Sequence, residues 1–392
     1  MFKSIPQLRQ WLSVMPVLWF CAIPLGNSCR SIFFVGALMS ILMQESVLTR
    51  IKPYLHTPWF YTLIAAIVWS SISIFWSPVF DHQTKFYFKK IGLLLLMPVM
   101  VLGFREEWQK KQSLNGFLIC MFIPFIIAIL KQYIGIQWHG DHDPGSIFYN
   151  HIITGFYTAF AAYLAFEMFF QYQRYWYLLA WGLFSFQVMC INPGRAAYGV
   201  YAILMSYALW TKTQGRIRWI IMSLLIVSSI LMSILSPAIH HGYQGLLNDW
   251  HMFQTGQLDT SLGFRLQFHH FAYTLFQKHW LIGGGLGSYD YWFIHLSPVP
   301  GWPFSPNTHS QYWFFASDLG VIGLLLWGAF FVTLGCYIKP MSWLGLVFIG
   351  LLLALSFNFL TDNMLFASPA SLIIGLWGIA LPMRCPIAAS NQ

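Results

Sequence analysis

The sequence predicts an all-α polytopic membrane protein with about twelve transmembrane helices. Of its 392 residues, 57% are hydrophobic and only 8% are charged, whereas a soluble domain carries about 25% charged residues. Apolar runs close to the ~20 residues needed to cross a bilayer recur along most of the chain. One connection, residues 237–308, is long enough to be a functional segment rather than a simple link.

The apolar runs divide the chain into three segments. Residues 1–236 hold nine expected spans, residues 237–308 form the long loop, and residues 309–392 hold three more spans. The first run follows basic residues, but Pro16 and Pro24 interrupt it and no A-x-A site follows, so we interpret it as a retained span rather than a signal peptide. The expected spans lie at residues 11–25, 31–44, 58–76, 91–103, 114–135, 152–170, 175–191, 196–210, 217–236, 309–337, 341–360 and 367–382.

The basic residues orient the chain in the membrane. With a cytoplasmic N-terminus, thirteen Lys and Arg residues fall on the cytoplasmic side and seven on the outer side, which favours cytoplasmic N- and C-termini. The positive-inside rule does not explain the basic residues on the outer side, and binding of an anion is one reason for their presence there. The net charge of +9 comes without a basic patch interleaved with aromatic residues, so no nucleic-acid partner is expected. The outer basic residues are Arg30, Lys85, Lys89, Lys90, Arg195, Arg265 and Lys278.

The sequence suggests neither a disulfide framework nor a metal site. The six cysteines are scattered without a C-x-x-C pair. His139, Asp141, His142 and Asp143 resemble metal ligands at first sight, but their spacing matches no established template. A solvated turn between two spans is the favoured interpretation.

Inside the long loop, the stretch GFRLQFHHFAYTLFQKHWLIGGGLGSY predicts a helix followed by a Gly-rich turn. Phe264, Phe268, Phe271 and Leu275 recur at steps of three and four and form one apolar stripe. Arg265 and His269 are four residues apart and share another face. For the turn, Gly283 to Gly287, a helix C-cap is favoured over a backbone nest for phosphate.

Four further positions could bind or support an anion on the outer side. In INPGRAAYGVY, Arg195 follows a Pro-Gly turn and begins a span, where backbone N–H groups and a guanidinium favour an anion. The alternative is an interfacial anchor for lipid headgroups. Lys89 and Lys90 are either anchors or part of a positive rim. Asp362 caps the last helix or lies beside His309.

His309, in SPNTHSQYWFFASDLGVIG, stands where a polar cluster gives way to an apolar span. We expect it to cap that span, with Asn307, Ser310 and Gln311 holding its ring. A lone histidine at such a border is commonly an interfacial residue. Its pKa near 6.5 nevertheless makes it a natural general base for a substrate hydroxyl that reaches this border.

Together these segments resemble the O-antigen ligases and the related O-antigen polymerases. His309-Ser310, nine residues and then Gly320-x-x-Gly323 resemble the ligase motif after the long loop. NPGRAAYG and the helix that begins near Arg265 resemble the family's two arginine segments. The resemblance covers about residues 145–365. Lys278-His279-Trp280 departs from it, because relatives often have a proline before the Gly-rich turn.

The resemblance implies a membrane-type, GT-C-like glycosyltransferase in the bacterial inner membrane, with its active site facing the periplasm. It implies transfer of an undecaprenyl-pyrophosphate-linked glycan to a hydroxyl of lipid A-core, inverting and without a metal or other cofactor. His309 would be the general base, and Arg195 and Arg265 would bind the donor pyrophosphate. Asp362, Lys89 and Lys90 would be supporting residues.

Three other functions remain open at this level. An O-antigen polymerase uses the same donor with another acceptor, and a protein O-oligosaccharyltransferase would need a means to grip a polypeptide. A transporter of lipid or glycan would carry charges at the bilayer midplane and paired repeats. Lys131 and Glu167 lie within the expected spans, and no repeat is visible.

Overall fold

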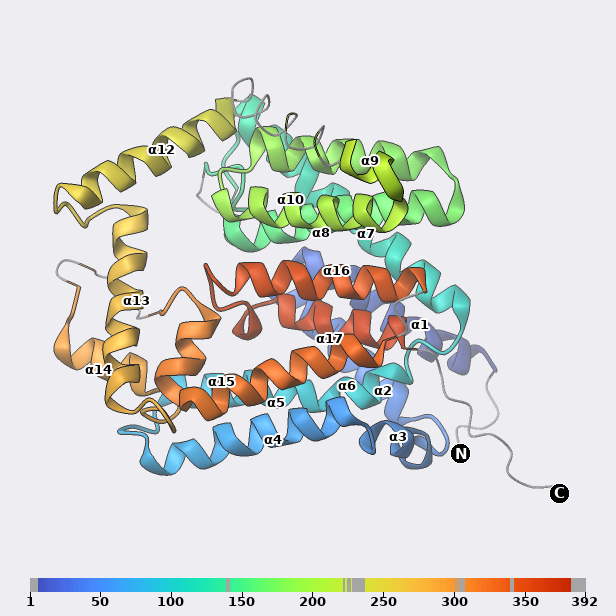
Figure 1. Cartoon of the computed structure of the whole chain (residues 1–392). Coiled ribbons are helices and arrows are strands. Elements are labelled where there is room, and N and C mark those ends of the chain that lie inside the picture. Colours follow the sequence, from blue (N-terminus) through green and yellow to red (C-terminus); the bar gives the residue numbers. More distant parts are fainter. Residues whose placement is uncertain are drawn as a thin grey trace.

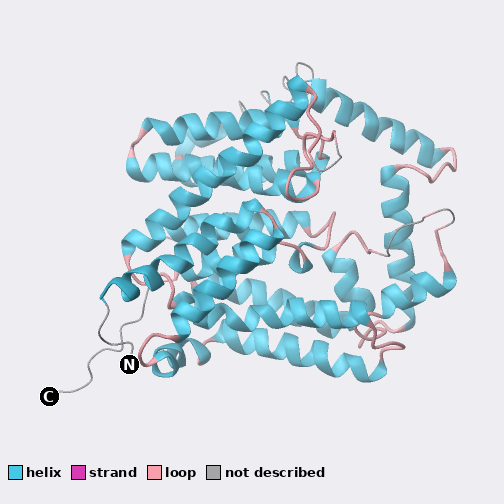
Figure 2. Ribbon diagram, turned by 180° about the vertical axis from the view of Figure 1, so that it is seen from behind, coloured by secondary structure: helices cyan, strands magenta, loops and turns pink. Residues whose placement is uncertain are grey.

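The computed structural model describes residues 6–138, 142–220, 223, 227, 237–299, 302, 307–338 and 342–381. This described part forms helices and connecting segments and no β-strand (Figure 2). The helices are α1 (Pro6–Ala22), α2 (Asn27–Leu42), α3 (Val47–Leu55), α4 (Pro58–Ile72), α5 (His82–Gly92), α6 (Met97–Val101), α7 (Glu107–Ile129), α8 (His151–Tyr172), α9 (Tyr175–Phe186), α10 (Arg195–Lys212), α12 (Pro237–Gln254), α13 (Ser261–Lys278), α14 (Ser288–Leu296), α15 (Gln311–Tyr337), α16 (Trp343–Asn358) and α17 (Pro369–Ala380). Short turns extend several of them: η2 (Ile23–Leu25), η3 (Ser73–Trp76), η4 (Leu93–Leu96), η5 (Leu130–Ile134), η6 (Gln187–Ile191) and η7 (Met364–Phe366).

The described helices include several that can cross a membrane. Four are long and apolar enough to do so alone: Pro58–Trp76, Glu107–Ile134, His151–Tyr172 and Gln311–Tyr337. These coincide with four of the expected spans. Shorter apolar helices, Leu12–Leu25, Tyr175–Ile191, Trp343–Asn358 and Pro369–Ala380, coincide with four more. The all-α class is confirmed, while the count of twelve spans stays a prediction.

The structure differs from the expected spans in three places. The second span continues into α3 through a bend of 105°, at which Ser46 has a left-handed backbone (φ 61°). The fourth span is divided among α5, η4 and α6, and α5 begins earlier than expected because the Asp81 carboxylate accepts the Thr84 N–H (2.9 Å). The ninth span, residues 217–236, lies mostly outside the described residues.

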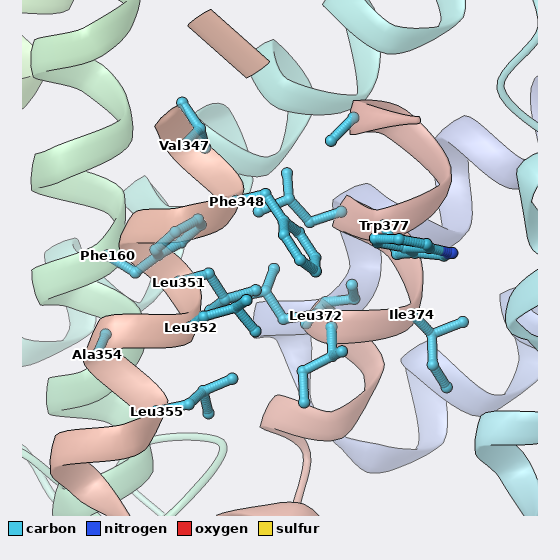
Figure 3. Packing of buried hydrophobic residues seen from close by; sticks show 14 of the residues in the cluster. Phe160, Val347, Phe348, Leu351, Leu352, Ala354, Leu355, Leu372, Ile374 and Trp377 are labelled. Carbon is cyan, nitrogen blue, oxygen red and sulfur yellow. The ribbon is translucent and has the colours of Figure 1, made fainter. Parts of the chain in front are cut away.

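The core is a continuous apolar cluster between the helices. Figure 3 shows Phe348 and Leu351 of α16 among Leu372 and Trp377 of α17, with Phe160 of α8 beside them. The Phe348 and Trp377 rings have their centroids 5.3 Å apart. Helices this apolar bury one face in such a core and leave others for lipid, as exposed Leu325 and Val332 of α15 illustrate.

The helices of the long loop lie across one end of the others. Figure 1 shows α12, α13 and α14 at the end of the bundle opposite α3. The predicted stripe of α13 is confirmed: Phe268, Phe271 and Leu275 are buried in a second cluster with Tyr289 and Phe293 of α14. The loop is therefore a packed structure with its own apolar core, at the end of the molecule where α15 begins.

Candidate active site

His309 lies immediately before α15, with its ring held against α13. Its backbone is left-handed (φ 46°), and its N–H donates to Asn307 Oδ1 (3.0 Å). The imidazole stacks on the Phe268 ring (centroids 5.4 Å apart, 19° between planes). A left-handed backbone at a residue other than glycine costs free energy and is found preferentially at functional sites.

Two details of the expected His309 environment are wrong. Ser310, not His309, caps α15, because its hydroxyl accepts the Trp313 N–H (3.4 Å). Asn307 bonds the backbone of His309 rather than its ring, and Gln311 instead accepts the Leu365 N–H (3.2 Å). Contact with Phe268 was not predicted, since stacking between a loop residue and a distant helix depends on tertiary structure.

Arg265 and His269 project from α13 toward the same place, as their shared helix face predicts. His269 Nε2 lies 3.4 Å from the His309 carbonyl oxygen. Burial, followed by the nearby positive charge of Arg195, lowers the pKa of Arg265, whereas the Asp362 and Asp249 carboxylates raise it. The guanidinium of Arg265 is thus within electrostatic reach of both Arg195 and Asp362.

Arg195 is the first residue of α10, after the predicted Pro-Gly turn. The Asn192 side chain shapes this turn by accepting the Gly194 N–H (2.7 Å). Arg195 Nη2 donates to Asp249 Oδ2 of α12 (3.0 Å). Its Nη1 is buried and has no hydrogen-bond partner. One end of this guanidinium is therefore engaged, and the other has unused donors.

Asp362 lies beside His309, as one of the two interpretations of the sequence expected. Its Oδ1 is 4.0 Å from His309 Nδ1, which is too far for a hydrogen bond, and it accepts the Asn363 N–H (2.8 Å). It does not cap the last helix, because α17 begins only at Pro369, after Ser368. Asp362 therefore acts on His309 through its charge.

The balance of these groups lowers the pKa of His309. Burial is the largest cause; Asp362 opposes it, and the nearby Arg265 and His269 act in the same direction as burial. His309 Nδ1 is buried and has no hydrogen-bond partner. A pKa below the ordinary 6.5 leaves the imidazole neutral near pH 7, which is the form that accepts a proton.

The contacts that the structure gives Lys89 and Lys90 are with other residues than these. They lie in the last turn of α5, where Lys90 packs over the Phe86 ring (5.2 Å). Burial and the nearby charges of Arg30 and Lys89 lower the pKa of Lys90. None of the contacts that the structure gives these two lysines is with Arg195, Arg265 or His309.

The Gly-rich turn binds a carboxylate of the protein itself, so its interpretation as a phosphate nest is wrong. Gly287 and Tyr289 donate their N–H groups to Asp318 of α15 (2.7 and 3.0 Å), and the Ser288 hydroxyl does the same (3.0 Å). Asp318 is fully buried. Its role was not predicted from the sequence, although an acidic residue in an apolar span is a signal of such a role.

Several other charged residues of the described structure are paired within the protein. Lys131 donates to the Ser146 carbonyl (2.7 Å), and Glu167 pairs with Lys212 (2.9 Å). The described residues contain no group of three His, Cys, Asp or Glu side chains suited to a metal ion. His139 and Asp141 lie outside the described residues, while Asp143 pairs with His151 (3.2 Å).

The arrangement suits group transfer from an anionic substrate. Two guanidinium groups can bind phosphate oxygens through planar forks, and a neutral imidazole nearby can accept a proton from a hydroxyl. Arg195, Arg265, His309 and Asp362 come from α10, α13 and the segments before α15 and after α16. They are brought to one place although 167 positions separate the first from the last.

Comparison with known proteins agrees with this geometry. The model of the O-antigen ligase family matches residues 180–328, a segment that contains Arg195, Arg265 and His309 but not Asp362. Members of this family are glycosyltransferase-like membrane enzymes, either ligases or polymerases. No match to a curated protein was found. Residues 180–328 are thus similar to the O-antigen ligase family.

Proposed function

We propose that this protein is an O-antigen ligase of the bacterial inner membrane. It transfers a glycan from undecaprenyl pyrophosphate to a hydroxyl group of lipid A-core on the periplasmic face. The observation that carries the proposal is the meeting of Arg195, Arg265 and His309 at the end of the bundle covered by α12, α13 and α14. Both termini are then cytoplasmic.

The donor binds through its pyrophosphate. Arg195 and Arg265 each offer a planar fork to phosphate oxygens, and the polyprenyl tail lies among the spans. The positive charge of Arg195 lowers the pKa of Arg265, so an anion between the two guanidinium groups is favourable. Because the two arginines stabilise the negative charge of the leaving group, the proposed chemistry needs no metal.

The transfer is a single displacement. The acceptor hydroxyl gives its proton to His309, and its oxygen attacks the anomeric carbon of the donor glycan. The bond from that carbon to the pyrophosphate oxygen breaks, and its electron pair leaves with undecaprenyl pyrophosphate. One displacement inverts the configuration at this carbon. Asp362 supports the step through its charge on His309 rather than as a nucleophile.

Polymerase activity is the second candidate, since the donor would be the same. The sequence His309-Ser310 followed by Gly320-x-x-Gly323 favours the ligase. A transporter is less well supported, because Lys131 and Glu167 are paired within the protein rather than free to bind a substrate. A protein O-oligosaccharyltransferase has no supporting observation here.

The surface polysaccharide of a deletion strain separates ligase from polymerase. If the protein is a ligase, long glycan chains accumulate on undecaprenyl pyrophosphate and lipid A-core stays unmodified. Lipid A-core capped with a single repeat unit would show a polymerase instead. Complementation by the intact gene restores the wild-type pattern in either case and serves as the control.

A further inference from the structure

Helix α12 buries a single side chain among those that the structure describes, and that side chain is a carboxylate. Asp249 is 9% exposed as a residue. Its neighbours Leu246, Leu247 and Trp250 are all at least 43% exposed. An amphipathic helix ordinarily buries apolar residues. In α12 the buried residue is instead the carboxylate that binds Arg195.

The contact between Asp249 and Arg195 involves only part of the guanidinium. Asp249 Oδ2 accepts from Nη2 at 3.0 Å, while Nη1 is buried without a partner. About two turns earlier on α12, Gly242 lies next to the arginine's side chain, where an added Cβ would be 3.6 Å from Arg195 Cγ. Asp249 and Gly242 together define where the Arg195 side chain lies.

A contribution to the stability of the fold does not by itself explain the ion pair between Asp249 and Arg195. A buried ion pair commonly contributes no more than apolar residues of the same volume would, because both charges lose water. The charge of Asp249 also acts on Arg265, where it opposes the effect of Arg195. The carboxylate thus lies where it can both orient one arginine and reduce the repulsion between two.

We propose that Asp249 is a positioning residue for donor binding. It holds the Nη2 end of Arg195 so that the Nη1 end stays available for a phosphate oxygen of a polyprenyl diphosphate. A guanidinium has five N–H donors, so Arg195 binds Asp249 and the diphosphate at the same time. This inference rests on the proposed function, because it takes the donor to be a diphosphate bound by Arg195.

The test measures the affinity of the purified full-length protein for farnesyl diphosphate, a short polyprenyl diphosphate. Asp249→Ala is expected to raise the dissociation constant about tenfold, the size of one charge-assisted hydrogen bond. Arg195→Ala is expected to raise it at least as much. The double variant should bind no more weakly than Arg195→Ala, because Asp249 acts only through Arg195.

Two controls keep the test decisive. Asn248→Ala changes an exposed neighbour on α12 and should bind like the wild type. Asp249→Asn keeps the shape of the side chain without its charge and should weaken binding in the same direction, which covers the case in which the alanine variant does not fold. Thermal unfolding of each variant reports any general loss of structure.

The outcomes separate this inference from the function on which it rests. Wild-type affinity in Asp249→Ala and Asp249→Asn, or a loss that adds fully to that of Arg195→Ala, would overturn the role of Asp249. Wild-type affinity in Arg195→Ala would instead show that the donor site itself is assigned wrongly.

Discussion

At the scale of single residues, the site is an imidazole whose protonation is set by neighbouring charges. Burial and Arg265 lower the pKa of His309, and Asp362 at 4.0 Å raises it. The neutral form is the base, so activity should be present above this pKa and be lost as the pH falls through it. The pH at which activity is lost therefore depends on the burial of His309 and on the charges around it.

Replacing Asp362 with asparagine removes the one negative charge that raises the pKa of His309. The acid limb of the pH profile of kcat/KM should then move to lower pH, by about one pH unit or more for a charge at this distance. Asp259→Asn, at an exposed position between α12 and α13, should leave the profile unchanged. An acid limb that stays in place or moves upward would exclude His309 as the titrating base.

Arg265 is expected to act through its shape as well as its charge. Arg265→Lys keeps the positive charge but loses the planar fork, so transfer should fall about tenfold or more. Lys278→Arg on the same helix is the matched control and should transfer at the wild-type rate. A fully active Arg265→Lys variant, measured in the same membrane transfer assay, would reduce Arg265 to an interfacial anchor.

At the scale of elements, the break in α15 explains why a glycine stands at position 320. Its backbone is left-handed (φ 69°, ψ −170°), and an added Cβ would lie 2.4 Å from the Leu281 carbonyl oxygen and 2.5 Å from the Gly283 nitrogen. The Gly-rich turn packs against α15 at this break, and the N–H groups of Gly287 and Tyr289 donate to Asp318. This joint fixes α13 and α14 to the bundle.

Gly320→Ala should therefore destabilise the protein. The left-handed backbone alone costs about 1–2 kcal/mol in a residue with a Cβ, and the close contacts with Leu281 and Gly283 add to it. Thermal unfolding in detergent measures the loss. Gly328→Ala in the same helix meets no atom within 4 Å and should be neutral or slightly stabilising. Equal unfolding temperatures for the two variants would contradict this account of the joint.

The sequence predicted those parts of the site that depend on local pattern. Arg195 after a Pro-Gly turn, the stripe of α13 and the polar border at His309 are each visible within about twenty residues. Asp249, Asp318 and the stacking of Phe268 on His309 were missed because these roles arise from partners more than 25 positions away, to which no local pattern points. For the same reason the sequence did not decide whether Asp362 caps a helix or faces His309.

At the scale of the whole molecule, the topology of the chain decides which side of the membrane the site faces. Helices α12, α13 and α14 lie at the end of the bundle opposite α3 (Figure 1). If the distribution of Lys and Arg sets the orientation, the first three face the periplasm and α3 faces the cytoplasm. Several of the described helices are long and apolar enough to cross a membrane, but their length and composition do not give the direction, which needs a separate measurement.

Single cysteines in a variant without the six native ones give that measurement. Asn248→Cys on α12 should react with a membrane-impermeant maleimide added to cells whose outer membrane has been opened. Lys52→Cys on α3 should react only after the inner membrane is broken. Both residues are exposed, so access to the reagent decides the result. The reverse pattern would turn the active site toward the cytoplasm.

The central claim is that His309 takes the acceptor's proton at a site where Arg195 and Arg265 hold a diphosphate. The most direct measurement is the rate of glycan transfer by purified His309→Ala in proteoliposomes, together with its affinity for farnesyl diphosphate. We expect the rate to fall about 100-fold or more while the affinity stays within about twofold of the wild type, since the arginines are intact. Transfer at the wild-type rate would contradict the account.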